Sequence, residues 1–227
     1  MKRLFEIIQI KPNIFLFKFK DYYDMAMHFL RYQEYYESAS PQFRGKQFEI
    51  FDFMRWYSKK YGKDAFTYPK DWGGFNIPSS VIMDVHALVI KDFNKYDASM
   101  FGGWDYCAQI IKDTSPVGTW VGKHPKFYII GSVDSGSTLK HEVAHGFFYT
   151  IPEYKKEMTA LVKALPLDIR KLVNKTLSKM GYTPKVFIDE TQAYMATGLY
   201  TESNPKFEDK LKKARKPFIK LFNKYNI

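Results

Sequence analysis

Residues 141–145 read His-Glu-Val-Ala-His, and this HExxH pattern constrains the local fold more than any other stretch of the chain. Positions i and i+4 of an α-helix lie one turn apart on one face, so the two imidazoles can reach one metal ion when the segment is helical. Ser137 or Thr138 can cap such a helix, which we expect to run to about Tyr149. A chance match to the pattern is expected only about once in two hundred shuffled sequences of this composition.

The residue types in this pattern suit hydrolysis with a metal ion. His141 and His145 can supply imidazole nitrogens at the roughly 2.0–2.1 Å that Zn–N bonds require. Glu142 cannot join them as a ligand, but its carboxylate can take a proton from metal-bound water and pass it to a leaving amine. We therefore expect His141 and His145 as ligands of Zn²⁺ and Glu142 as the general base.

A catalytic zinc site normally has a third protein ligand. The pattern HExxHxxGxxH is excluded, because Phe148 and Ile151 stand where its Gly and third His would be, and no histidine follows the motif. A downstream carboxylate is therefore expected, and Glu190 fits best, early in a helix that follows two intervening helices. Asp189 is expected to cap that helix or to brace a ligand. The other carboxylates weighed are Glu153, Glu157 and Glu202.

The two stretches resemble the gluzincin branch of the zincin metallopeptidases, in which HExxH supplies two ligands and the base and a later E-x-x-A supplies the third ligand. Here the matching residues are 141–145 and 190–193, and the gap between them is similar to that in lethal-factor-like members. The resemblance covers about residues 126–200 and implies a zinc-dependent metalloendopeptidase that acts on protein or peptide substrates. Several gluzincins carry an Asp four residues after the third ligand to orient a histidine. Tyr194 stands there instead, so Asp189, Tyr194 or another residue must do this.

The resemblance also implies an oxyanion donor and a substrate-binding strand. Tyr182, on the loop ahead of the glutamate helix, is the expected donor, and Tyr194 is the next candidate, followed by His86 or His124. In this family an edge strand before the active helix binds substrate backbone, and residues 127–131 are placed to do so, with an interior strand as the alternative.

Periodicity along the chain predicts an α+β fold of the zincin type, in which a small mixed sheet packs on the HExxH helix and a mainly helical part follows. The expected division is an N-terminal α+β part at 1–115, which could be integral to one domain, and a catalytic core at 116–227. Residues 94–118, with two adjacent glycines, are expected to be irregular. The expected strands are 3–10, 14–20 and 126–131, and the expected helices are 22–36, 41–61, 79–89, 137–149, 153–165, 167–180, 189–198 and a basic helix from 205.

Charge suggests a further partner. The net charge is +11, and residues 205–227 hold eight Lys or Arg against two acidic residues. Such a segment can attract an acidic partner or nucleic acid, and a solvated face of an amphipathic helix is the alternative. Two other functions therefore stay open: a basic protein that binds nucleic acid or acidic surfaces on this scaffold, and a metal-dependent amidohydrolase that is not a peptidase.

Other features of the sequence mainly exclude classes of protein. Cys107 is the one cysteine, which excludes an intramolecular disulfide and a cysteine-based zinc cluster. No apolar run approaches the about eighteen residues of a membrane span, and no cleavage site follows the N-terminal stretch, so a cytoplasmic location is expected by default. His28 shares a helical stripe with Asp24 and Arg31, and we expect it to be solvated.

Overall fold

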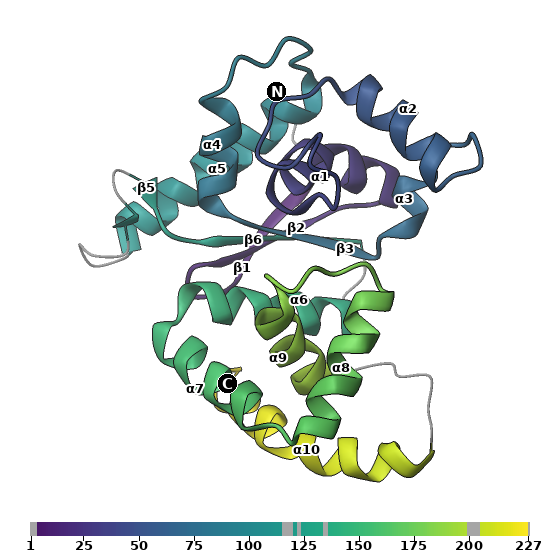
Figure 1. The fold of residues 1–227 in the computed structure, drawn as a ribbon. Coiled ribbons are helices and arrows are strands. Elements are labelled where there is room, and N and C mark those ends of the chain that lie inside the picture. Colours follow the sequence, from purple (N-terminus) through teal and green to yellow (C-terminus); the bar gives the residue numbers. More distant parts are fainter. Residues whose placement is uncertain (1–3, 115–119, 122–123, 134–135, 199–204, 227) are drawn as a thin grey trace. The chain divides into compact units, whose positions relative to one another are not determined.

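The computed structural model describes residues 4–114, 120–121, 124–133, 136–198 and 205–226 (Figure 1). The chain divides into two compact units, Met1–Leu139 and Lys140–Ile227, and each is described by itself. The boundary between these units, at residues 139 and 140, lies later in the chain than the boundary expected between residues 115 and 116. Within the described residues the chain combines a small mixed sheet with many helices, which confirms the α+β class. None of the described helices is long and apolar enough to cross a membrane.

The first unit contains a four-stranded sheet in the order β1-β2-β6-β3. β1 (Glu6–Lys11) and β2 (Ile14–Lys18) form an antiparallel hairpin, and Asn13 in its turn has a φ of 60°, which asparagine tolerates better than most residues. β6 (Tyr128–Ser132) runs parallel to β2 and antiparallel to β3 (Gly74–Pro78). A separate two-stranded ladder joins β4 (Trp120–Val121) and β5 (His124–Pro125).

β6 is an interior strand. It pairs along its length with β2 on one side and with β3 on the other, and all five of its residues are buried. Both rows of its backbone groups are therefore already hydrogen-bonded within the sheet. The expectation that residues 127–131 form a substrate-binding edge is wrong, because an interior strand and a covered edge strand show the same apolar pattern in sequence.

The helices of the first unit differ from the expected ones at three places, one of which is the short helix α3 (Tyr68–Asp71), which was not expected. The helix expected at 41–61 begins only at Ile50, and the segment expected to be irregular at 94–118 is largely a 20-residue helix. A side chain at Gly103 would meet the ring of Phe17 at 2.9 Å, so this glycine allows the helix to approach the sheet closely rather than breaking it. The helices are α1 (Tyr22–Glu37), α2 (Ile50–Lys60), α3 (Tyr68–Asp71), α4 (Ser79–His86) and α5 (Lys95–Thr114).

His28 and Arg31 on α1 are buried, so the expectation that His28 is solvated is wrong. The side of α1 that carries them packs against α5. Arg31 donates to Asp97 of α5 at 2.9 Å, and this pairing allows its charge to be buried. His28 donates from Nδ1 to the carbonyl of Asp24 at 2.6 Å. Its ring packs among the rings of Phe5, Phe19 and Tyr96.

The described residues of the second unit form helices joined by short connections, with no strand among them. α9 packs against α7, α8 and α10 (Figure 1). Its small side chains at Ala193 and Ala196 are buried, which lets the neighbouring helices approach. Gly181 and Gly198 follow the ends of α8 and α9 with positive φ values of 95° and 141°. The helices are α6 (Ser137–Thr150), α7 (Pro152–Ala164), α8 (Leu167–Lys179), α9 (Phe187–Thr197) and α10 (Pro205–Tyr225).

Candidate metal centre

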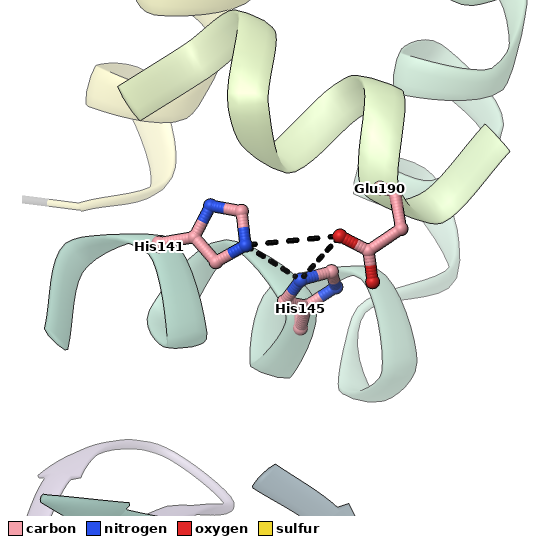
Figure 2. A group of neighbouring side chains, drawn as sticks. All are labelled: His141, His145 and Glu190. Atoms are coloured by element: carbon pink, nitrogen blue, oxygen red, sulfur yellow. Dashed lines mark hydrogen bonds and ion pairs between the residues drawn. The ribbon is translucent and has the colours of Figure 1, made fainter. Parts of the chain in front are cut away.

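Two helices of the second unit bring three possible metal ligands together (Figure 2). His141 and His145 project from successive turns of α6, and their Nε2 atoms lie 3.2 Å apart. Glu190 projects from the first turn of α9, and its Oε2 lies 3.8 Å from Nε2 of His141 and 3.7 Å from Nε2 of His145. Among the described residues, this is the one group of three His, Cys, Asp or Glu side chains found to be close enough to hold a metal ion.

The separations of these donors match the size of a metal site. A point equidistant from the three atoms would lie about 2.1 Å from each, which agrees with Zn–N and Zn–O bonds of about 2.0–2.2 Å. Two imidazoles and one carboxylate are also a common ligand set of catalytic zinc. The residues present therefore fit a divalent metal ion in both distance and chemistry.

Hydrogen bonds at the opposite ring nitrogens decide where each histidine carries its proton. Asp189 Oδ1 lies 2.8 Å from Nδ1 of His145, and a carboxylate can only accept there. Thr197 Oγ1 lies 3.3 Å from Nδ1 of His141, and the Thr197 hydroxyl already donates to the carbonyl of Ala193. Both histidines therefore carry a proton on Nδ1, so Nε2 is the nitrogen of each neutral ring that can direct a lone pair toward the same point. Two lone pairs and a carboxylate oxygen around one point attract a cation.

Burial and nearby charge act differently on the two histidines. Burial, with the charge of His145, lowers the pKa of His141 to about 3, so its imidazole is neutral at physiological pH. Burial also opposes protonation of His145, but the carboxylates of Asp189 and Glu190 raise its pKa well above the usual value. The carboxylates thus favour positive charge at His145, either a proton or a bound cation, whereas His141 stays neutral.

Glu142, the residue after His141 on α6, is not one of the three clustered side chains. The side chain of Glu142 is buried. The ring of the preceding residue, His141, faces the cluster. After burial and the charge of Glu190, the charge of Glu142 is a further cause that raises the pKa of Tyr182 and Tyr194. The negative charge of Glu142 thus acts on both phenols, and its expected role as a general base stays a prediction.

Tyr182 and Tyr194 form a pair next to His141. Their hydroxyl oxygens lie 3.3 Å apart, and the ring of Tyr194 packs on the ring of His141 with centroids 4.3 Å apart. The backbone N–H of Tyr182 donates to the carbonyl of Leu177, which follows from the turn at Gly181. Burial is the main cause that raises the pKa of both phenols, so both keep their protons and can donate a hydrogen bond.

The other candidate residues lie elsewhere or outside the described part of the chain. Glu157 is exposed and accepts from Tyr225 at 3.0 Å, and Glu153 is also exposed. His86 belongs to the first unit, where its Nε2 lies 3.0 Å from the hydroxyl of Tyr32. Glu202 and the side chain of His124 lie outside the described residues.

Sequence analysis missed three residues around the centre: Thr197, Gln192 and Tyr154. A signal was present for Thr197, because it lies seven residues after Glu190 and therefore on the same face of α9. Gln192 follows Asp189 by three residues and shares its face in the same way. No local signal marks Tyr154, since its position depends on how α7 packs against α9.

Comparison of the chain with protein-family models, curated proteins and solved structures finds no match. The case for a function therefore rests on the residues of the centre and on their contacts.

Proposed function

We propose that this protein is a zinc-dependent metalloendopeptidase. The observation that supports the proposal most is the convergence of the Nε2 lone pairs of His141 and His145 with the Glu190 carboxylate, with Glu142 buried alongside. The same arrangement supports the expected assignment of all four residues.

In this proposal the three convergent residues hold Zn²⁺, which when bound supplies Lewis acidity for a carbonyl and lowers the pKa of a water molecule. Glu142 accepts a proton from the attacking water on a carboxylate oxygen and delivers it to the leaving amine nitrogen. Asp189 and Thr197 keep the ring protons of the two histidines on Nδ1, so that both Nε2 atoms stay available as ligands. Burial of these groups excludes bulk water and strengthens each of these electrostatic interactions.

Tyr182 is the proposed donor to the oxyanion that forms when the carbonyl is attacked. Its protonated phenol lies beside Tyr194 and in the field of Glu190, on a loop that does not carry a metal ligand. Tyr194 packs on a ligand ring, so its replacement would also disturb His141. This difference makes Tyr182 the better candidate to test.

Tyr182→Phe should lower kcat by about 10²–10³-fold, because one donor to the oxyanion is lost. Zinc content, thermal stability and KM should stay close to the wild-type values, since the ring remains and no ligand is touched. Steady-state kinetics with a cleaved peptide, together with metal analysis, measures these quantities. Near-normal turnover would mean that Tyr182 only packs, and Tyr194→Phe would be assayed next.

Cleavage of a mixed peptide library, followed by mass spectrometry, tests the proposed activity. The zinc-loaded protein should produce new peptide amino termini at internal bonds, and the metal-free protein should not. Release of an acyl group from a small amide without cleavage of any peptide would instead identify a metal-dependent amidohydrolase that is not a peptidase.

A second candidate, binding of a polyanion such as nucleic acid, is favoured by the surface of α10. Its apolar side chains, including Leu211 and Phe218, are buried within the unit. Its opposite side exposes lysines at four-residue steps. These are Lys212, Lys216 and Lys220. We infer that an acidic partner would bind along this lysine face.

Replacing all three of these lysines by glutamine should weaken binding of a labelled DNA duplex and reduce its salt dependence. Each lost phosphate contact changes the slope of log K against log salt by about 0.9. Fluorescence anisotropy over about 50–200 mM salt measures both effects. A matched control replaces Lys171, Lys175 and Lys179 on α8, which removes the same charge from another helix. Equal binding by both triple variants, or none by the wild type, would contradict a specific role of α10.

A further inference from the structure

We propose that Gln192 and Tyr154 are positioning residues of the metal centre, which act through Asp189 to hold the ring of His145 in its ligating orientation. The inference rests on the proposed metal site and not on peptide hydrolysis. It adds a third helix, α7, to the two helices that supply the ligands.

The carboxamide of Gln192 lies at the junction of three helices. Its Nε2 donates to Asp189 Oδ1 at 3.1 Å and to the carbonyl of Ala144 on α6 at 3.3 Å. Its Oε1 accepts from the hydroxyl of Tyr154 on α7 at 3.0 Å. The residue is fully buried, so water cannot replace these partners. A buried amide that loses one of them would leave a polar group unsatisfied, which costs about 1–3 kcal/mol.

These contacts allow only one orientation of the amide. The groups that face Nε2 are a carboxylate oxygen and a backbone carbonyl, and both can only accept a hydrogen bond. A flipped amide would place Oε1 against these two acceptors and would lose both hydrogen bonds. On the other side, burial raises the pKa of Tyr154, as does the charge of Asp189, so its phenol keeps the proton that it donates to Oε1.

The same oxygen of Asp189 receives hydrogen bonds from two directions. Oδ1 accepts from Nδ1 of His145 at 2.8 Å and from Gln192 at 3.1 Å. The Asp189 side chain is about one third exposed, so it is not held in place by packing alone. Gln192 fixes this oxygen relative to α6, because it also bonds the carbonyl of Ala144, the residue before His145. Gln192 thus sets the orientation of the His145 imidazole through Asp189, without contacting the ring itself.

Gln192→Met should weaken metal binding by about tenfold, the lower end of the about 10- to 100-fold cost of losing an outer partner of a metal ligand. Methionine keeps the length of the side chain but has no N–H group. Competition with a chromogenic chelator gives the Zn²⁺ affinity. The visible spectrum of the Co²⁺-loaded protein reports ligand geometry, so it should change in this variant, whereas a loss of stability alone would leave it unchanged.

A double variant tests whether Gln192 acts through Asp189. In the Asp189→Asn background, Gln192→Met should have little further effect on the Zn²⁺ affinity, because the acceptor that it positions is already altered. If the two effects instead multiply, Gln192 acts independently of Asp189 and the proposal is overturned.

Tyr154→Phe provides a milder test that removes only one hydroxyl. It should weaken Zn²⁺ binding by less than the about tenfold expected for Gln192→Met, because the amide keeps its other contacts. The matched control is Tyr225→Phe, since Tyr225 packs on Tyr154 at 5.2 Å between ring centroids but bonds Glu157 outside the centre. Equal Zn²⁺ affinity in both tyrosine variants would also overturn the proposal, even if Gln192→Met fails to fold.

These measurements separate the inference from the proposed function. A wild-type protein that binds Zn²⁺ and shows the expected order of variants, yet cleaves no peptide, would retain the positioning roles and refute the peptidase. A wild-type protein with no measurable Zn²⁺ or Co²⁺ binding would refute both.

Discussion

Replacing His141, His145 or Glu190 by alanine should remove zinc from the protein, because each variant loses one of only three protein ligands. The Zn²⁺ affinity should fall by more than the factor of about 10 to 100 that is typical when a residue hydrogen-bonded to a metal ligand is removed. Metal content per chain, measured after dialysis against a competing chelator, gives the result directly. Zinc at 100 times its Kd should also stabilise the wild type by about 2.7 kcal/mol, and this gain should vanish in the three variants.

Glu153→Ala is the matched control for Glu190→Ala. It removes an exposed glutamate from α7 in the same unit and should leave the zinc content unchanged. If Glu190→Ala retained full zinc under the same chelator, the third ligand would be misassigned. Asp189 would then be tested first, since it already contacts His145, and Glu202 second.

Glu142→Gln should keep the zinc and the fold but lose about 10²–10⁴-fold in the rate of peptide cleavage. An amide has nearly the shape of the carboxylate, yet it cannot accept the proton of the attacking water. Initial rates on a peptide identified from the library, with metal content and thermal unfolding measured on the same preparation, give all three values.

The outcome for Glu142→Gln also separates the two main hypotheses. Cleavage near the wild-type rate with zinc bound would refute the role of Glu142 as base. Unchanged DNA binding by this variant, with hydrolysis absent from the wild type as well, would instead favour the polyanion-binding protein.

The pattern of the sequence was most informative where a feature depends on neighbouring residues. The helix at 137–149 and the stops at Gly181 and Gly198 agree with the structure because the i,i+4 period and the left-handed turn of glycine are local properties. The strand expected at 126–131 is present for the same reason, shifted slightly to 128–132.

Errors arose where packing overrode a local signal. The glycines near residue 102 suggested a break, yet α5 continues because Gly103 faces the aromatic ring of Phe17. A histidine and an arginine on α1 suggested a solvated face, but α5 covers them and Asp97 neutralises the arginine. Neither partner is near in sequence, so neither could be inferred from the pattern around the residue itself.

The candidate metal centre also combines features set by neighbouring residues with features set by packing between helices. The sequence by itself determined that His141 and His145 share one face of a helix, because their spacing equals about one helical turn, and it indicated that a later carboxylate would complete the set. Only the tertiary structure decided that Glu190 lies against them, that Asp189 and Thr197 lie within hydrogen-bond distance of their Nδ1 atoms, and that a hydrogen-bonded chain runs from Tyr154 through Gln192 to Asp189. The physical reason is that helix geometry fixes contacts within one or two turns, whereas contacts between α6, α7 and α9 depend on which buried side chains fit together across the core.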